Sequence, residues 1–209
     1  MTKLWEEYAA LVAAEEDYAL DVRALEAYQA RFAQAMAHVD LTALIDLLCG
    51  YGHSAEFDGV TLHESADEVP QGALEGLGYP TEFLAWHAAM GFQTVVLDLD
   101  ISQRINDTAS LLKELAYFDA PVACGLLPIA VDGSGSPTLW DTRSPGTPLR
   151  FLSHSEGLNC LHGAPVAGRR EALEEVMDLV AQKRFLEWLK AGFEQVHALY
   201  VEELEPCEE

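Results

Sequence analysis

The sequence is short of positive charge. It contains 12 Lys and Arg residues against 35 Asp and Glu residues, which gives a formal net charge of −23. Between Arg31 and Arg104 there is no Lys or Arg, although this stretch carries eleven carboxylates. Such a chain repels nucleic acids and anionic membranes and attracts basic proteins. Because unpaired carboxylates are costly to bury, we expect most of them to be exposed and to create a region of strongly negative potential.

Long apolar runs are also missing. The best runs, 41–49 and 121–131, are well short of the ~20 residues that a membrane-spanning helix needs. Carboxylates at Glu6 and Glu7 interrupt the place where a secretory signal would be apolar. The four cysteines are widely spaced without a CxxC pair, which favours reduced thiols over a disulfide or zinc frame. We therefore expect a cytoplasmic protein that contacts no membrane and uses no metal or cofactor.

Half of the residues are apolar, enough for one folded domain. Residues 3–39 repeat apolar side chains at steps of three and four, which predicts a long amphipathic helix. Residues 169–205 also read as helical, in two pieces that meet near Gln182 or Gly192. Short strands are expected at 59–63, 92–99, 125–131, 138–141 and 149–153. The pattern predicts an α+β fold in which a short antiparallel sheet is flanked by helices, with long helices at both termini.

Glycine, proline and capping residues divide the chain further. Pro80 is placed to begin a helix over 81–90, and Gly91 is placed to end it. Asp40 is a natural cap for a helix over 41–49, and Asn106, Asp107 or Thr108 for a helix over 109–117. Residues 154–165 read as turns. We expect a single domain over 1–209, made of a helical extension (1–50), an α+β core (51–180) and a C-terminal helix with an acidic tail (181–209).

Five short segments between 78 and 180 resemble the SUKH superfamily, which includes Smi/Knr-type regulators and many bacterial toxin-immunity proteins. They are Gly78-Tyr79-Pro80-Thr81-Glu82-Phe83-Leu84, Leu127-Pro128-Ile129-Ala130-Val131-Asp132-Gly133-Ser134-Gly135, Leu139-Trp140-Asp141, Leu149-Arg150-Phe151-Leu152-Ser153-His154 and Ala164-Pro165-Val166-Ala167. The chain departs from the family pattern where Met90-Gly91 replaces a usual Asn-Gly pair. It departs again where Gly168 replaces a common capping Ser.

The resemblance implies a binding function, because many relatives neutralise secreted toxins that are often basic nucleases. An acidic surface suits that role, since it mimics nucleic-acid phosphates and steers association. A shared fold alone does not establish a shared function. Together with the charge pattern, the resemblance predicts a basic protein partner and no catalytic residues. The predicted partner-binding residues are Asp58, Glu64, Asp67, Glu68, Glu82, Asp132, Trp140, Asp141 and Glu156. Trp140 would be a binding anchor if it were half exposed beside Asp132 and Asp141.

Two other functions remain open. The strand ending in Asp98-Leu99-Asp100 resembles the first motif of haloacid-dehalogenase-type phosphohydrolases, in which the first Asp attacks phosphorus and Mg²⁺ lies between carboxylates. The usual Gly-Thr-type turn is replaced by Ile101-Ser102-Gln103, and no clear later acidic pair follows. The other possibility is a regulatory or structural protein that dimerises through the apolar stripe of 3–39.

Overall fold

The computed structural model describes a defined part of the chain, as two compact units. The described residues are 22–38, 40, 43, 60–65, 67, 69–70, 72–97, 99, 101–161 and 165–204. The first unit takes its described residues from 1–61, 97–99 and 190–209. The second unit is formed by residues 62–96 and 100–189. The expected division at residues 50 and 180 stays a prediction.

Seven strands form one open sheet in which the spatial order follows the chain order. They are β1 (Val60–Glu64), β2 (Gln93–Leu97), β3 (Gln103–Ile105), β4 (Leu126–Asp132), β5 (Pro137–Asp141), β6 (Arg150–Phe151) and β7 (Asp178–Leu179). The pairs from β3 to β7 are antiparallel. Consecutive strands are neighbours throughout the sheet, but their connections differ in length: β4 and β5 are joined by a short turn, whereas residues 152–177 connect β6 to β7. The mixed α+β class predicted from the sequence is confirmed.

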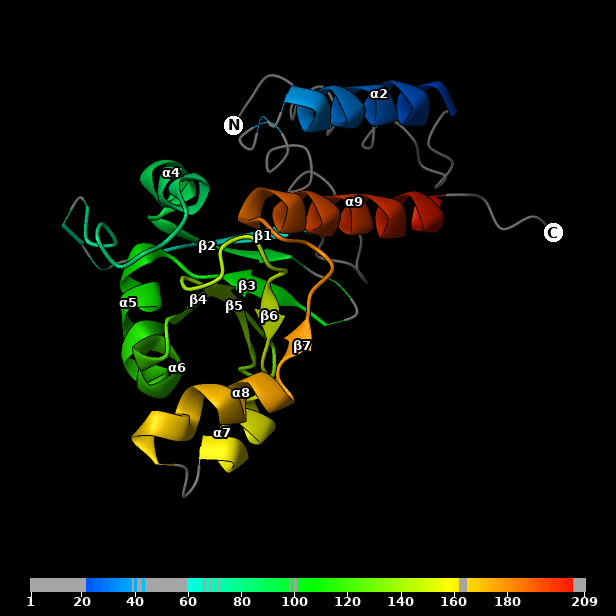
Figure 1. Ribbon diagram of the computed structural model, residues 1–209. Coiled ribbons are helices and arrows are strands. Elements are labelled where there is room, and N and C mark those ends of the chain that lie inside the picture. The colour runs from blue at the N-terminus through cyan, green and yellow to red at the C-terminus, as the bar shows by residue number, and fades with distance from the viewer. Residues whose placement is uncertain are drawn as a thin grey trace. The chain divides into compact units, whose positions relative to one another are not determined.

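The described helices lie before, between and after the strands. They are α2 (Val22–His38), α4 (Thr81–Met90), α5 (Thr108–Tyr117), α6 (Asp119–Ala123), α7 (His154–Leu161), the short 3₁₀ helix η1 (Val166–Gly168), α8 (Arg169–Val176) and α9 (Phe185–Leu204). In the second unit α5 and α6 pack on β4, while α8 packs on α7 and α6 (Figure 1). This packing brings the end of β5 next to the first turn of α8.

The β4–β5 hairpin is the buried centre of the second unit. Every residue of both strands is buried, and Leu126 lies opposite Asp141 at the open end of the hairpin. The register shifts between Pro128 and Ala130. Proline has no N–H to donate to a ladder, and a bulge is one of the places where a strand tolerates it. The Leu127-Pro128 step therefore fits this strand despite being internal to it.

Apolar side chains from segments that are distant in the sequence form two buried groups in the second unit. Leu126, Leu139 and Leu173 have no exposed surface, and Cys124, Leu152 and Met177 complete their cluster. In the other group Phe83 packs edge-on against Phe185, with ring centroids 4.9 Å apart, and Trp86 lies at 5.9 Å from the same ring. Burying such side chains stabilises by about 1.5–3 kcal/mol each, so these two groups account for much of the hydrophobic driving force of this unit.

Several predicted boundaries are confirmed at the residue level. Helix α4 begins directly after Pro80 and is followed by Gly91. Asp107 caps α5 by accepting a hydrogen bond from the Ser110 backbone N–H at 3.0 Å. Asp40 likewise accepts the Ala43 N–H at 3.0 Å, but the helix that it was predicted to cap stays a prediction, because Ala43 is the only one of residues 41–49 that the structure describes.

Other predictions need correction or are not covered. Residues 154–161 form helix α7 and not a turn, and the strands β3 and β7 were not predicted. The 169–205 segment does divide near Gln182, into α8 and α9. The helix predicted for 3–39 is described only over Val22–His38, and its earlier part lies outside the described residues. Most of the helix predicted for 41–49 also lies outside them.

Candidate functional site

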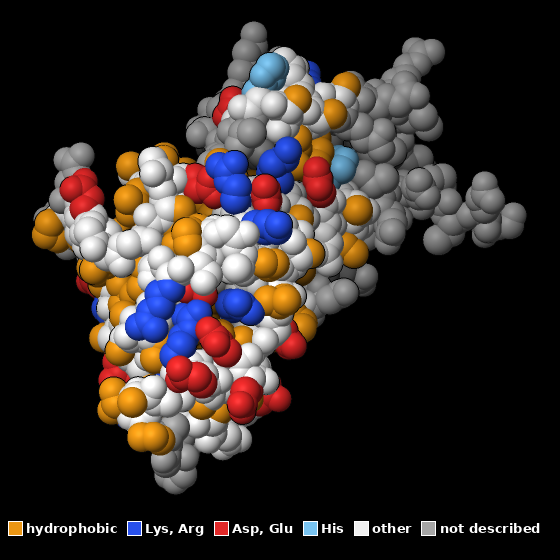
Figure 2. Space-filling view, viewed as in Figure 1, with side chains coloured by type: hydrophobic (Ala, Val, Ile, Leu, Met, Phe, Trp, Pro, Cys, Tyr) orange, Lys and Arg blue, Asp and Glu red, His pale blue; other side chains and the backbone are white. Residues whose placement is uncertain are grey.

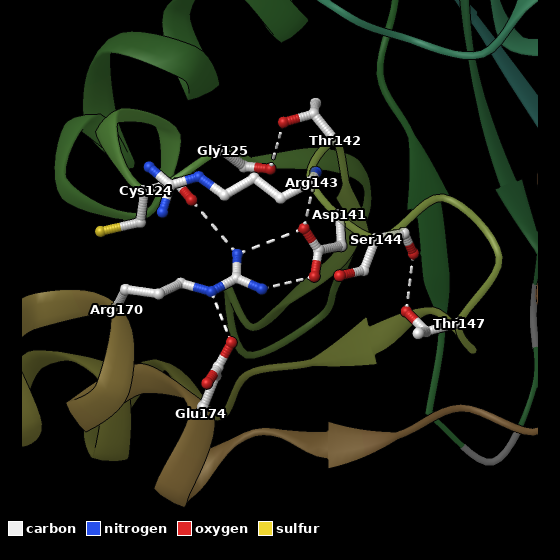
Figure 3. Close-up of polar contacts among 9 residues, drawn as sticks. All are labelled: Cys124, Gly125, Asp141, Thr142, Arg143, Ser144, Thr147, Arg170 and Glu174. Atoms are coloured by element: carbon white, nitrogen blue, oxygen red, sulfur yellow. Dashed lines mark hydrogen bonds and ion pairs between the residues drawn. The ribbon is translucent and has the colours of Figure 1, made fainter.

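The most organised polar centre among the described residues lies where β5 ends. Asp141 is the last residue of β5 and is only 2% exposed. Arg170, in the first turn of α8, donates to both carboxylate oxygens of Asp141, at 3.3 Å to Oδ1 and 2.5 Å to Oδ2. Arg170 also donates from Nε to Glu174 Oε1 at 2.6 Å and from Nη1 to the Cys124 carbonyl at 3.2 Å (Figure 3). One guanidinium thus joins β5, α8 and the end of α6.

Gly125 allows the tight turn whose Cys124 carbonyl accepts a hydrogen bond from Arg170. Its φ of 81° lies in the left-handed region, which glycine adopts without a steric penalty. A Cβ atom there would also come within 2.8 Å of Thr142 Oγ1. Thr142 donates to the Gly125 carbonyl from both its backbone N–H and its hydroxyl, each at 2.9 Å. These bonds fix the Gly125–Leu126 peptide. The preceding peptide, whose Cys124 carbonyl accepts from Arg170, is held by the Gly125 N–H, which donates to the Val122 carbonyl at 2.9 Å.

The electrostatics of the centre keep Asp141 and Arg170 charged. Burial alone would raise the pKa of Asp141, but the hydrogen bonds from Arg170 and from the Arg143 backbone N–H, together with the Arg170 and Arg150 charges, lower it overall. Burial would lower the pKa of Arg170, and its bonds to Asp141 and Glu174 raise it instead. The pair is therefore ionised at neutral pH, and each partner compensates the desolvation of the other.

Three further arginines lie on or next to the elements that carry this pair, and none has a carboxylate partner among the described residues. Arg143 follows Asp141 by two residues, and its Nε would lie 3.2 Å from a Cβ at Gly125. Arg150 lies on β6 and is close enough to lower the pKa of Asp141. Arg169 precedes Arg170 at the start of α8. None of the three forms an ion pair in the described part of the chain. Figure 2 shows Lys and Arg side chains gathered over this region.

The predicted partner-binding residues fall into three groups. Asp132, Trp140 and Asp141 are buried, at 4%, 8% and 2% exposure. Asp132 Oδ1 accepts from the backbone N–H groups of Ser134 and Ser136, both at 2.8 Å, and so closes the hairpin turn. The Trp140 indole N–H donates to the Gly78 carbonyl at 3.2 Å. The expectation of a half-exposed Trp140 between two exposed acids is corrected: all three side chains are used inside the fold.

The second group is at the surface but partly neutralised. Asp67 is exposed and pairs with Lys113 at 2.8 Å. Glu82 is 12% exposed at its side chain and pairs with Arg184, whose Nε donates to Glu82 Oε2 at 3.1 Å. Lys113 and Arg184 therefore neutralise acids of the stretch between Arg31 and Arg104, which has no Lys or Arg of its own.

The remaining predicted residues are Glu64 and Glu156, which are exposed, and Asp58 and Glu68, which lie outside the described residues. Glu156 belongs to a mixed surface that we call the α7–α8 surface. It is defined by Tyr117, His154, Glu156, Val166, Glu171, Glu175, Asp178 and Leu179. Tyr117 is 62% exposed, Val166 76% and Leu179 61%, and the four carboxylates are exposed as well. Figure 2 shows acidic side chains over the part of the molecule where Figure 1 labels α7 and α8.

Tyr117 is held in place although it is exposed. Its ring stacks on the His154 imidazole with centroids 5.9 Å apart and an interplanar angle of 9°. Its hydroxyl lies 3.4 Å from His154 Nε2. The backbone N–H of His154 donates in turn to Ser136 Oγ at 3.0 Å. An aromatic side chain fixed in this way loses little conformational entropy when a partner covers it.

Of the residues that define the α7–α8 surface, only Glu156 was predicted from the sequence to bind a partner. One signal was present: Glu171, Glu174 and Glu175 follow each other at helical spacing and fall on one face of α8, and Asp178 continues the spacing just past the end of that helix. No comparable signal marked Tyr117, whose partner His154 is 37 residues later in the chain.

The alternative of a phosphohydrolase site depends on two aspartates that the structure does not describe. Asp98 and Asp100, its two predicted residues, lie outside the described residues. In the described part of the chain no three His, Cys, Asp or Glu side chains are grouped in a way that could hold a metal ion.

The alternative of dimerisation was based on the repeat of apolar side chains over residues 3–39. In its described part Phe32, Ala35 and Met36 are buried, and the Phe32 ring stacks on His197 of α9 at 4.0 Å. This portion of the stripe therefore packs within the first unit. No helix in the described part of the chain has the length and apolar character that a membrane span requires.

Comparison with known proteins gives no assignment: no protein-family model, curated protein or solved structure matches the chain.

Proposed function

We propose that this chain is a cytoplasmic protein-binding module of the bacterial toxin-immunity kind, which captures a basic protein partner through the α7–α8 surface. The observation that carries the proposal is the pairing of the exposed Tyr117 with His154, which lies two residues before the exposed Glu156. An acidic surface that served only solubility would not need a 62% exposed tyrosine stacked on a histidine at 5.9 Å. Tyr is among the residues that dominate binding energy at protein interfaces.

The composition of the surface supports this role. Glu156, Glu171, Glu175 and Asp178 supply negative charge, which raises the rate of encounter with a cationic partner. Val166 and Leu179 add apolar area, which contributes affinity that charge alone does not give. The formal net charge of −23 extends the attraction beyond the contact itself. The local resemblance to the SUKH superfamily is consistent with neutralisation of a basic, nuclease-type toxin.

Affinity capture from the organism that encodes the chain tests the proposal. The intact protein is expected to retain a basic protein at low salt and to release it at high salt, because ionic screening weakens charge attraction. Tyr117→Ala should weaken retention about thirtyfold, the effect of losing roughly 2 kcal/mol at an interface hot spot. The double variant Glu171→Lys/Glu175→Lys should abolish retention.

Glu75→Lys is the matched control, since Glu75 is an exposed acid of the same unit outside the α7–α8 surface. It should leave capture nearly unchanged. If Glu75→Lys weakens capture as much as the α7–α8 variants do, the protein acts by overall charge and the proposed surface is wrong. If no basic protein is retained by the intact chain at low salt, the function itself is wrong.

A further inference from the structure

Strand β7 lies at the end of the sheet and, in the described part of the chain, has a neighbouring strand on one side only. That neighbour is β6, which pairs with it antiparallel and places Arg150 opposite Leu179 and Phe151 opposite Asp178. Leu179 is 61% exposed, and Asp178, the residue before it, is exposed as well. Figure 1 shows β7 following from α8 at the end of the sheet. The open edge of β7 is therefore part of the α7–α8 surface, which Asp178 and Leu179 help to define.

The hydrogen bonds between β6 and β7 leave the backbone of Leu179 pointing outward. In an antiparallel ladder, pairs of residues that exchange hydrogen bonds alternate with pairs that do not. The Val180 N–H donates to the Leu149 carbonyl at 2.8 Å, so the neighbouring pair of Arg150 and Leu179 exchanges none. The N–H and C=O of Leu179 therefore point away from β6. No group among the residues that the structure describes bonds to either of them.

The side chains along this edge differ between the two faces of the sheet. Residues directly opposite each other in an antiparallel pair share a face, and successive residues of a strand alternate between faces. Leu179 therefore shares one face with Arg150, and Asp178 shares the other with Phe151. The first face offers an exposed apolar side chain next to a cation. The second offers an exposed carboxylate that forms no ion pair with any described residue.

From the outward backbone groups and these two side chains we infer that β7 binds an extended segment of the basic partner as an additional strand, antiparallel like the pairs from β3 to β7. One residue of the segment lies opposite Leu179 and exchanges both backbone hydrogen bonds with it. That residue is apolar, because it covers the Leu179 side chain on the face of Arg150. The residues on either side of it are Lys or Arg, because they lie on the face of Asp178. Strand addition takes affinity from backbone bonds and specificity from alternate side chains. The inference rests on the proposed function, since it specifies which part of the basic partner the α7–α8 surface contacts.

The charges around β7 favour a basic segment over a second copy of this chain. The described charged residues on β6, α8, β7 and the segment up to α9 are Arg150, Arg169, Arg170, Glu171, Glu174, Glu175, Asp178, Lys183 and Arg184. Arg170, Glu174 and Arg184 are already in ion pairs. Among the others, three acids and one cation are exposed, while Arg150 and Arg169 are half-buried. The exposed charge at this edge is therefore negative, and the net charge of −23 would repel a second copy. The half-buried arginines offset part of that charge, so selectivity depends on the position of Asp178 and not on charge alone.

A labelled peptide of alternating Lys and Val, acetylated and amidated at its ends, tests the inference by fluorescence anisotropy with the full-length chain at low salt. Saturable binding is expected. N-methylation of the valines removes the N–H that donates to the Leu179 carbonyl and should weaken binding about tenfold or more. N-methylation of the lysines removes N–H groups on the opposite edge of the peptide and should change the affinity little.

The two methylated peptides have the same charge and composition, so attraction by charge alone would give them equal affinity. Equal affinity, or a greater loss on methylation of the lysines, overturns the inference. Absence of saturation with the unmethylated peptide also overturns it, and would show that this short, charged edge strand serves only to prevent pairing with other chains.

Substitutions on β7 locate the binding edge. Leu179→Pro removes the outward N–H, which the β6–β7 ladder does not use, and should abolish peptide binding while the thermal midpoint is retained. Leu179→Ala keeps this N–H and should weaken binding about tenfold through lost apolar contact; it decides the matter if the proline variant is unstable. Asp178→Asn should weaken binding by a smaller factor. Leu77→Ala and Glu75→Gln are the matched controls, because both residues are exposed in the same unit outside the α7–α8 surface. Losses in the controls equal to those in the β7 variants overturn the inference.

Capture of the natural basic partner separates this inference from the proposed function. Loss of capture in both Tyr117→Ala and Leu179→Pro supports the function and the added strand together. Loss in Tyr117→Ala with full retention by Leu179→Pro leaves the function intact and overturns the added strand. If the intact chain captures no basic protein but binds the alternating peptide with the methylation pattern above, the proposed function is wrong and the strand-binding edge stands.

Discussion

Arg170 donates to both carboxylate oxygens of Asp141 although the two residues are 29 positions apart, and the two side chains are 13% and 2% exposed. A buried pair of this kind contributes little relative to an apolar pair, but it is costly to break, because removal of one charge leaves the other desolvated. The contact therefore determines whether the end of β5 and the start of α8 stay together.

Arg170→Gln should lower the free energy of unfolding by about 3 kcal/mol, since it leaves the buried Asp141 carboxylate without its ion-pair partner. Asp141→Asn should cost less, because Arg170 keeps its ion pair with Glu174. Urea denaturation followed by circular dichroism measures this. The pair Arg184–Glu82 provides the comparison, because Arg184 is 61% exposed and Glu82, although only 12% exposed, also accepts the Leu186 N–H at 3.3 Å. Arg184→Gln should therefore cost no more than about 1 kcal/mol. Equal losses in the two pairs would show that the burial of Asp141 has no energetic consequence.

Gly125→Ala should destabilise more than Gly135→Ala. Both glycines have positive φ, 81° and 86°, so both substitutions strain the backbone by about 1 kcal/mol. A Cβ at Gly125 also meets Thr142 Oγ1 at 2.8 Å, whereas nothing lies within 4 Å of a Cβ at Gly135. The difference in thermal midpoint between the variants isolates this steric contact. Identical midpoints would contradict the packing described for the Cys124–Gly125 turn.

Asp107→Ala should destabilise the second unit by about 2 kcal/mol. Asp107 caps α5 through Ser110 N–H, and its Oδ2 also accepts the Thr94 hydroxyl at 2.9 Å. Asp107→Asn keeps the shape and one acceptor oxygen and should recover at least half of the loss. Denaturant unfolding of the two variants checks the order. If the asparagine variant is as unstable as the alanine variant, the charge of Asp107 matters more than its hydrogen bonds.

Local signals in the sequence were enough to place many elements. Pro80, Gly91 and Asp107 act on residues within four positions, so the ends of α4 and α5 were predictable. Helix α7 was missed because Gly157 reads as a turn residue. The structure uses Gly157 for close packing instead, since a Cβ there would lie 2.9 Å from a Leu152 methyl.

The candidate sites were less predictable, because they depend on pairs that are distant in sequence. Whether Glu82 or Asp141 faces a partner or an internal arginine is decided by contacts 102 and 29 residues away. No periodicity or spacing encodes such distances. The prediction that acids between 31 and 104 stay unpaired considered only their own segment, and Lys113 and Arg184 arrive from outside it.

The stability of the protein should fall between pH 6.5 and about pH 4 because of His87. Burial lowers the pKa of His87 from 6.5 to about 4, although the charge of Asp107 acts to raise it. The imidazole sits against Phe83, with centroids 4.5 Å apart, and its Nδ1 is 3.1 Å from Thr108 Oγ1. In this window the unfolded chain binds a proton that the folded protein excludes, so stability decreases as pH falls.

The expected slope from this one group is up to about 1.4 kcal/mol per pH unit, present between the two pKa values and absent above pH 6.5. His87→Gln removes the titrating group and should flatten the dependence of unfolding free energy on pH in that range. His197, whose pKa is also lowered by burial, contributes in the same direction, so His197→Gln is measured alongside. The carboxylates Asp107 and Asp141 have lowered pKa values and lose their contribution only at more acidic pH. A profile that keeps its full slope in both histidine variants would therefore assign the acid sensitivity to groups other than the buried imidazoles.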